Sequence, residues 1–246
     1  MIERTVRQAP NNFGEYIRSS RYSTLLDILL PFIPLSVLGF VGTVIGTGTP
    51  VGGVLVNAGY ILTILLAWGM LKIRGSGWRE IGMARPKSWL RTVLIGLASM
   101  AGAIFISVAF QSIAVSLPGQ EIAPIDQSRF DPLFGNPIRL GLMLILAWTT
   151  IAFGEEMFFR AYLIDRFSAL FGSTKYVTAL SLAFSAALFG LVHIGDQGWL
   201  GTVSTAVIGL FWGWIFLRTG RNLWVTIVAH GLVNSMSFLL LYAGVG

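Results

Sequence analysis

The chain alternates between long apolar runs and short polar links. Each run is long enough to cross the roughly 30 Å hydrocarbon core of a bilayer as an α-helix, which rises about 1.5 Å per residue. A helix also satisfies every backbone polar group inside lipid. We therefore predict an all-α, polytopic transmembrane helical bundle of about seven spans, over residues 23–46, 53–73, 90–116, 138–163, 176–194, 199–217 and 223–243.

The fourth run carries three ionisable residues, Glu155, Glu156 and Arg160. An ionisable group at the centre of a spanning helix costs about 2.5–3.5 kcal/mol on insertion scales. These side chains are therefore expected to face protein or a water-filled cavity, and each needs a partner. The partners should come from the other runs.

Glu156 and Arg160 are spaced i, i+4 with the acid first, which favours an ion pair on one helix face. Glu155 points about 100° away from Glu156 on a helix, so it is not on the Arg160 side. We interpret the pair as a structural clamp that leaves Glu155 free for chemistry. A purely structural alternative, in which both carboxylates pair with basic groups near the membrane surface, stays open.

Composition supports a membrane protein, because 54% of the residues are hydrophobic, 11% are charged and the mean hydropathy is +0.74. The chain has no Cys, which excludes disulfides and thiolate chemistry. No basic-aromatic groove accompanies the net charge of +6, so we expect the lipid bilayer as a partner and no nucleic acid. The first 22 residues lack the pattern of a cleaved signal peptide, so the first run should be a retained anchor.

The basic residues predict the orientation. All of the 17 Lys and Arg residues except Arg129 and Arg139 fall in the N-terminal segment or in alternate links, if Arg160 and Arg166 are counted with the link after the fourth run. The positive-inside rule then places the N-terminus in the cytoplasm and the C-terminus outside. We expect a multi-pass protein of the cell (inner) membrane.

The only two histidines lie in the later runs. His193 ends the fifth run, and His230 lies within the seventh, one turn before Asn234 on the same helix face. Either histidine alone is as often a hydrogen-bonded packing residue, and an intramembrane Asn can simply join helices. Together with the two glutamates, however, these residues fall in four consecutive runs that can enclose one cavity.

Such a set suits hydrolysis. A carboxylate can act as general base on a water that an imidazole orients, and a second imidazole with an amide can stabilise the oxyanion of a tetrahedral intermediate. The same set, Glu155, His193 and His230, can instead hold Zn²⁺, although no His-Glu-x-x-His run favours the metal. A serine triad has less support, because no serine in the runs has a Gly-x-Ser-x-Gly setting.

Three motifs carry a resemblance to a known family: Glu155-Glu156-x-x-x-Arg160, Phe189-x-x-x-His193 and His230-x-x-x-Asn234. They resemble the signature motifs of the CPBP family, the CAAX proteases and bacteriocin-processing enzymes also called the Abi family. The motifs span about residues 138–240. Residues 78–86 also resemble a short cytoplasmic stretch that precedes this core in bacterial members.

The resemblance implies a CAAX prenyl protease-like intramembrane endopeptidase. It assigns Glu155 as catalytic base with His193, and His230 with Asn234 as the oxyanion-stabilising pair. Glu156 and Arg160 become the supporting pair. The substrate would be a membrane-associated peptide or lipidated protein, such as a prenylated CAAX chain. We prefer a site without a metal, with Zn²⁺ as the alternative.

The resemblance also suggests three parts in the chain: a cytoplasmic N-terminal segment over residues 1–22, accessory helices over 23–137 with a basic cytoplasmic loop at 74–90, and a catalytic helical core over 138–246. Two alternatives to the enzyme remain. One is a non-catalytic membrane immunity or scaffold protein that binds a peptide in the same cavity. The other is a small transporter with the acidic and histidine residues as an ion relay, although no paired repeat of interrupted helices supports it.

One difficulty yields a specific expectation. The predicted spans place Glu155 and His230 near mid-membrane or toward the cytoplasm, but His193 at the outer end of the fifth run, and catalytic groups cannot meet across such a difference in depth. We therefore predict that the turn at residues 194–199 dips into the protein, so that the fifth helix does not fully cross. Irregular backbone at that depth must be buried in protein or line a wet cavity.

Overall fold

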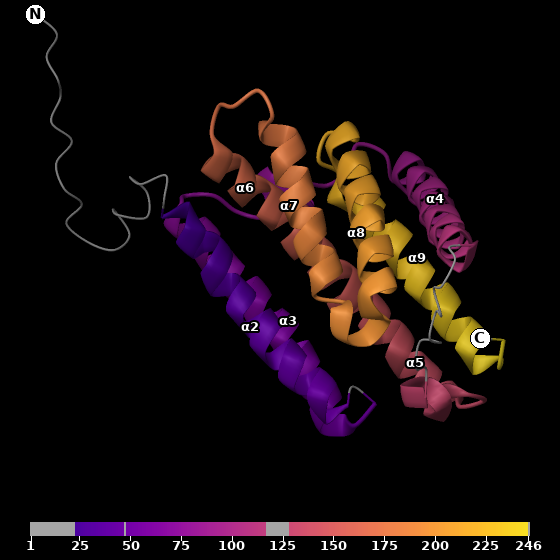
Figure 1. The fold of residues 1–246 in the computed structure, drawn as a ribbon. Helices are drawn as coiled ribbons and strands as arrows, with labels where there is room; N and C mark the ends of the chain where they lie inside the picture. Colours follow the sequence, from indigo (N-terminus) through magenta and orange to yellow (C-terminus); the bar gives the residue numbers. More distant parts are fainter. Residues whose placement is uncertain (1–22, 47, 117–127, 246) are drawn as a thin grey trace, which may run out of the picture.

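The computed structural model describes residues 23–46, 48–116 and 128–245, and this part of the chain is helical without strands (Figure 1). The predicted all-α bundle is thereby confirmed. The long helices are α2 (Thr24–Ile45), α3 (Pro50–Ile73), α4 (Trp89–Ser116), α7 (Val177–Leu191), α8 (Ile194–Arg218) and α9 (Leu223–Tyr242). Two short turns of helix, η1 (Arg79–Met83) and η2 (Ser128–Leu133), lie in the links.

The fourth predicted run forms one helical rod, Pro137–Phe171, of 35 residues. It is built from α5 (Pro137–Leu146), two π-helical stretches, η3 (Ala147–Gly154) and η4 (Glu156–Leu163), and α6 (Ile164–Phe171). The helix therefore continues eight residues beyond the predicted end at 163. Arg160 and Arg166, which the sequence analysis counted with a loop, are buried in it at 1% and 8% exposure. Assigning these two residues to a loop was wrong, because they lie in the helix and acidic side chains within the bundle neutralise them.

Six helices in the described part of the chain are long and apolar enough to cross a membrane, and α7 is a shorter apolar helix. The 15 residues of α7 give a length of about 22 Å, less than the roughly 30 Å of a bilayer core. α8 follows after a short break and is itself interrupted at Gly198, whose φ of 62° lies in the left-handed region. The protein is thus a multi-pass membrane protein in which the fifth apolar run forms a helix too short to cross.

The helices pack in pairs around the long rod. α2 lies against α3, α7 against α8, and α4 against α9, while η3 and η4 contact α3, α7 and α9 from within (Figure 1). The α7–α8 pair is close because Gly190 has no side chain, so that a Cβ there would come within 2.5 Å of the Thr202 carbonyl oxygen. Gly209 and Gly213 of α8 also face α7.

An ion-pair network joins the helices at the end of the bundle where α2 begins. Asp27 accepts from Arg74 Nε at 2.8 Å and from Arg166 Nη1 at 3.3 Å, and the Tyr162 hydroxyl donates to the Asp27 carbonyl oxygen at 2.8 Å. Arg166 also pairs with Asp165, which Arg221 reaches at 3.2 Å. The network fixes the α2–α3 pair to the rod and to the link before α9.

One sequence prediction, the cytoplasmic N-terminal segment at 1–22, lies outside the described residues. The helix bounds elsewhere agree with the predicted runs to within a few residues, apart from the fourth and fifth runs.

Candidate active site

Glu155 lies between the two π-helical stretches of the rod, where the backbone winds more widely than in an α-helix. Such π segments are rare and often occur at functional sites. On the N-terminal side of Glu155, the rod lines a cavity through Arg139, Met143, Leu146 and Ile151. On its C-terminal side, every residue from Glu156 to Ile164 is buried. Glu155 therefore lies at the floor of the cavity, at 2% exposure.

Glu156 connects two of the predicted site residues. Its Oε2 lies 3.1 Å from Arg160 Nε, one helical turn away, and its Oε1 lies 2.9 Å from Nδ1 of His230 on α9. The Arg160 guanidinium also stacks over the Phe189 ring at 3.9 Å. Arg160, Glu156 and His230 thus form a buried chain of polar contacts. These contacts fix the orientation of the His230 ring.

His230 turns its other nitrogen toward Glu155. With Glu156 ionised against Arg160, His230 Nδ1 carries the hydrogen that it shares with Glu156, so Nε2 is left to face the cavity floor. Nε2 lies 3.8 Å from Glu155 Oε2. The indole of Trp212 packs against the His230 ring at a centroid distance of 4.9 Å.

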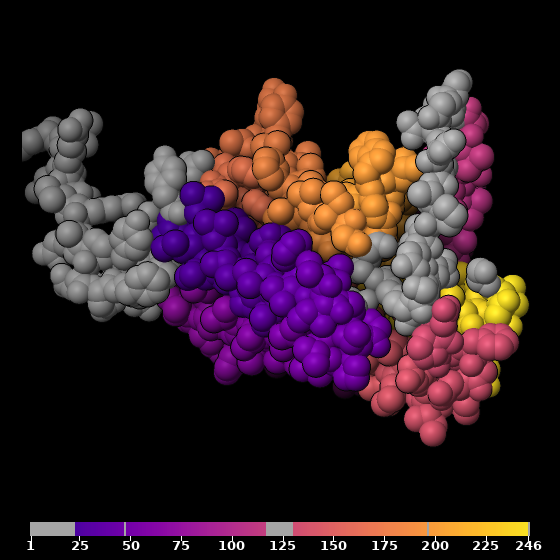
Figure 2. Space-filling model, turned by 60° about the horizontal axis from the view of Figure 1, so that its bottom comes forward, coloured from indigo at the N-terminus to yellow at the C-terminus, as the bar shows by residue number. Residues whose placement is uncertain are grey.

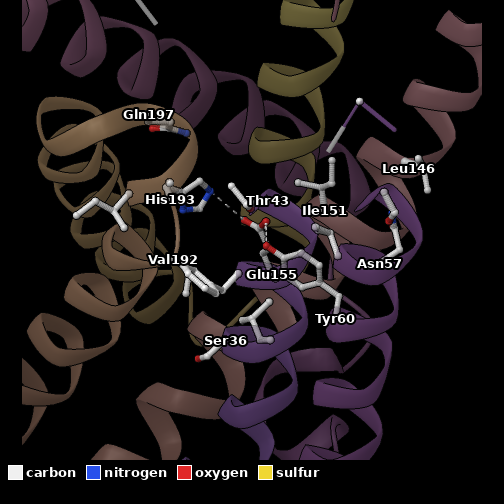
Figure 3. Close-up of a pocket in the computed structure, with 18 of the residues that line it drawn as sticks. Ser36, Thr43, Asn57, Tyr60, Leu146, Ile151, Glu155, Val192, His193 and Gln197 are labelled. Carbon is white, nitrogen blue, oxygen red and sulfur yellow. Dashed lines mark hydrogen bonds and ion pairs between the residues drawn. The ribbon is translucent and has the colours of Figure 1, made fainter. Parts of the chain in front are cut away.

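His193 faces the same oxygen from the turn between α7 and α8 (Figure 3). Its Nδ1 lies 2.7 Å from the Phe189 carbonyl oxygen. A carbonyl only accepts, so Nδ1 carries the hydrogen and Nε2 points at Glu155 with a free lone pair when the ring is neutral. His193 Nε2 lies 4.0 Å from Glu155 Oε2. The short α7 thus brings His193 to the depth of Glu155, as the sequence analysis expected.

Tyr60 of α3 is the residue that sequence reasoning missed. Its hydroxyl donates to Glu155 Oε1 at 2.6 Å, and the tyrosine is 9% exposed (Figure 3). The contact joins residues 95 positions apart, and a tyrosine in an apolar run gives no local signal of it. A strong donor on one carboxylate oxygen leaves the other, Oε2, to face the two imidazoles.

Asn234 follows His230 on α9 and is not among the residues that line the cavity. Its Nδ2 is buried and has no hydrogen-bond partner among the described residues. Glu155 Oε2 is in the same condition. Buried polar atoms are nearly always bonded, so each of these two atoms can still take a hydrogen-bond partner such as a water or a substrate group.

The cavity above Glu155 has a volume of about 790 Å³ and is lined mostly by apolar side chains. Its walls come from α2, α3, the rod and the α7–α8 region, and Figure 3 shows Asn57 and Tyr60 on one side of Glu155 with Val192, His193 and Gln197 on the other. A large apolar pocket with a few convergent polar groups is the usual form of a ligand site. This one suits an extended peptide or an acyl chain.

The donor set does not fit a zinc ion well. Ligand atoms in a tetrahedral zinc site lie roughly 3.3–3.4 Å apart, given bonds of about 2.0–2.1 Å. The two imidazole nitrogens lie 4.0 and 3.8 Å from Glu155 Oε2. No group of three or more His, Cys, Asp or Glu side chains within the described ranges is placed to hold a metal ion.

The same distances suit a water molecule. Separations of 3.8 and 4.0 Å exceed a hydrogen bond, but one water can bridge atoms at such a spacing. A water beside Glu155 Oε2 could donate one hydrogen to the carboxylate and the other to His193 Nε2. Its lone pairs would then face the cavity, where a substrate carbonyl can approach.

Comparison with known families gives one match. Residues 137–236 match the family model described as "Type II CAAX prenyl endopeptidase Rce1-like". No curated protein and no solved structure matches the chain. The matched region contains Glu155, Glu156, Arg160, His193, His230 and Asn234 but not Tyr60.

Proposed function

Residues 137–236 make this chain a member of the CAAX protease family, and from that premise we propose that it is an intramembrane endopeptidase in which Glu155 activates a water. The observation that carries the proposal is the convergence of two imidazoles on Glu155 Oε2 while Tyr60 holds Oε1. A carboxylate at the floor of an apolar cavity, with an unpaired oxygen and two adjacent imidazoles, suits general-base hydrolysis.

The proposed reaction begins with the bridging water. Glu155 Oε2 removes one proton while the water oxygen bonds to the carbonyl carbon of the scissile peptide, and His193 Nε2 accepts the second hydrogen as a hydrogen bond. The carbonyl oxygen becomes an oxyanion. Glu155 then passes its proton to the leaving nitrogen, the C–N bond breaks, and a carboxylic acid and an amine are released.

We assign His230 and Asn234 to the oxyanion. The buried Asn234 Nδ2 is a donor without a partner among the described residues, and donors arranged before reaction stabilise developing charge without reorganisation. His230 donates from Nε2 when the ring is protonated, and Glu156 stabilises that cation through Nδ1. Glu156 and Arg160 act as positioning residues, since Glu156 holds His230 Nδ1 and Arg160 holds Glu156.

The substrate we propose is a membrane-associated peptide, including a lipidated or CAAX-type chain. The apolar lining of the cavity supports this class. We further propose a cell-membrane location with the N-terminus in the cytoplasm, which the distribution of loop Lys and Arg supports. The spacing of the imidazoles and the carboxylate supports a site that acts without a metal.

The test is peptide cleavage by purified protein in detergent, with a set of prenylated and acylated peptides as substrates. Wild-type protein should cleave at least one peptide, and Glu155→Ala and His193→Ala should fold but lose the activity. A chelator should leave the rate unchanged. Loss of activity with chelator and its return with Zn²⁺ would overturn the metal-free mechanism, and cavity variants that keep the protein's biological effect would favour a non-catalytic immunity or scaffold role.

A further inference from the structure

The lining of the cavity extends from Glu155 toward one end of the bundle. From Glu155 its lining runs along α2 to Thr43 and Val44, past Gly48 to the start of α3, and along the rod to Arg139. The remaining walls near this end are η2 and the turn at residues 194–197. The mouth is thus formed by the α2–α3 connection, η2, the start of α5 and the α7–α8 turn. Figure 2 looks toward this end, with α2 and α3 in indigo and purple, the α7–α8 region in orange and the start of the rod in rose.

The opposite end is closed by packed side chains. Phe158, Phe159, Tyr162 and Leu163 follow Glu155 in the rod and have no exposed surface. Below them, the Asp27–Arg74–Arg166 network ties α2 and α3 to the rod. A substrate therefore has no path to Glu155 from the end where α2 begins.

The basic residues of the links collect at this closed end. They sit in the links after α3 and before α4, between α6 and α7, and between α8 and α9: Arg74, Arg79, Arg85, Lys87, Arg91, Lys175, Arg218 and Arg221. The mouth end has only Arg129 and Arg139, with the exposed Asp131 between them. The difference in basic residues between the two ends stays large even when the buried Arg160 and Arg166 are left out. By the positive-inside rule the closed end is cytoplasmic.

The short α7 deepens the cavity on the mouth side. α7 starts at the basic end and its 15 residues rise about 22 Å, so the α7–α8 turn ends some 8 Å below the far face of a 30 Å core. Ile194, Gly195 and Gln197 of that turn line the cavity. Arg139 lies near the start of the rod, 16 residues before Glu155. At an α-helical rise the two residues are about 24 Å apart along the rod. The cavity is therefore a vestibule that leads from the far headgroup level to mid-membrane.

We propose that the active site opens to the extracytoplasmic side and that the substrate is a peptide tethered in the outer leaflet by an apolar anchor. This inference rests on the proposed function for its substrate but not for its orientation. The apolar vestibule holds the anchor and the adjoining chain, and Arg139 at the rim binds an anionic group such as an acidic side chain or a lipid phosphate.

The orientation is tested by cysteine labelling, for which the natural absence of Cys gives a clean background. Gln197→Cys places a thiol near the start of α8, at the mouth of the cavity. The matched Lys175→Cys places one just before α7, at the basic end. In intact cells a membrane-impermeant maleimide should label Gln197→Cys as fully as after lysis, and Lys175→Cys only after lysis. If Gln197→Cys folds poorly, Gly48→Cys at the mouth replaces it. Labelling of Lys175→Cys but not of the mouth variant in intact cells would overturn the proposal.

The substrate side is tested with right-side-out and inverted membrane vesicles. A mixture of peptides, each carrying one palmitoyl chain, should be cleaved in right-side-out vesicles by wild-type protein and not by Glu155→Gln. Cleavage confined to inverted vesicles would overturn the inference. Absence of cleavage in both vesicle types and in detergent, together with outward labelling of Gln197→Cys, would reject the enzyme assignment while leaving the orientation supported.

Discussion

At the scale of single residues, the site depends on how each oxygen of Glu155 is used. Tyr60 occupies Oε1 with a hydrogen bond of 2.6 Å, and the two imidazoles face Oε2. The sequence predicted Glu155, His193 and His230 as a set because ionisable residues in apolar runs need partners. It did not predict Tyr60, because tyrosine also occurs in membrane helices without any such contact.

Removing the Tyr60 hydroxyl tests its role as a positioning residue. In Tyr60→Phe we expect kcat to fall about tenfold with KM little changed, since a hydrogen bond to a charged group contributes about 1.5–3 kcal/mol and the ring still fills its space. The measurement is steady-state cleavage in detergent, with Tyr176→Phe, at an exposed position, as the control. An unchanged kcat, or a loss equal to that of the control, would show that Tyr60 only packs.

The buried pair of Glu156 and Arg160 has a structural consequence. In Arg160→Met the Glu156 carboxylate would stay buried without its guanidinium partner, and breaking a buried pair typically costs about 3–5 kcal/mol. We expect a clearly lower thermal unfolding temperature in detergent than for wild type. The exposed Arg85→Met should leave the temperature unchanged. Equal unfolding temperatures of Arg160→Met and Arg85→Met would contradict the structural role of the Glu156–Arg160 pair.

At the scale of elements, the positions of helices follow from the sequence but their ends do not. The apolar runs identified α2, α3, α4, α8 and α9 to within a few residues. The fourth run was predicted to end at residue 163, yet the helix continues to Phe171 through Arg166, which pairs with Asp27 of α2. Asp27 lies 139 positions from Arg166 in the sequence, so no local pattern reveals this partner. The Glu156–Arg160 pair, in contrast, was predicted from its i, i+4 spacing.

The ion network around Asp27 gives an element-scale prediction. Asp27→Asn removes the charge that Arg74 and Arg166 share, which should loosen the α2–α3 pair and destabilise the fold by about 2–4 kcal/mol. We expect earlier unfolding in detergent and faster proteolysis in the link between α3 and η1. Glu80→Gln, in the exposed part of the same region, is the control. A melting curve that coincides with wild type would show that the network does not hold the pair.

The close approach of α7 and α8 gives another prediction. A Cβ at Gly190 would lie 2.5 Å from the Thr202 carbonyl oxygen, so Gly190→Ala should push α8 away and move His193 from Glu155. We expect loss of both stability and cleavage activity. Gly69→Ala is the matched control, because nothing lies within 4 Å of its added methyl group, and alanine favours a helix by about 1 kcal/mol. Similar behaviour of the two variants would contradict the packing described here.

At the scale of the whole molecule, the two ends of the bundle have different tasks. One end carries the basic links and the buried ion network, and the other carries the mouth of the cavity. The sequence predicted the membrane class and the charge asymmetry. The direction in which the cavity extends from Glu155 could be read only from the structure. It depends on which half of the rod is buried and on the short length of α7.

The central claim is that Glu155 makes a water nucleophilic inside the membrane. The most direct measurement is the single-turnover rate of peptide cleavage by Glu155→Gln relative to wild type, in detergent, with both proteins shown to melt alike. The glutamine keeps the size and an acceptor for Tyr60 but cannot take a proton, so the rate should fall by about 10²–10⁴-fold. A Glu155→Gln protein that cleaves at close to the wild-type rate would contradict the account.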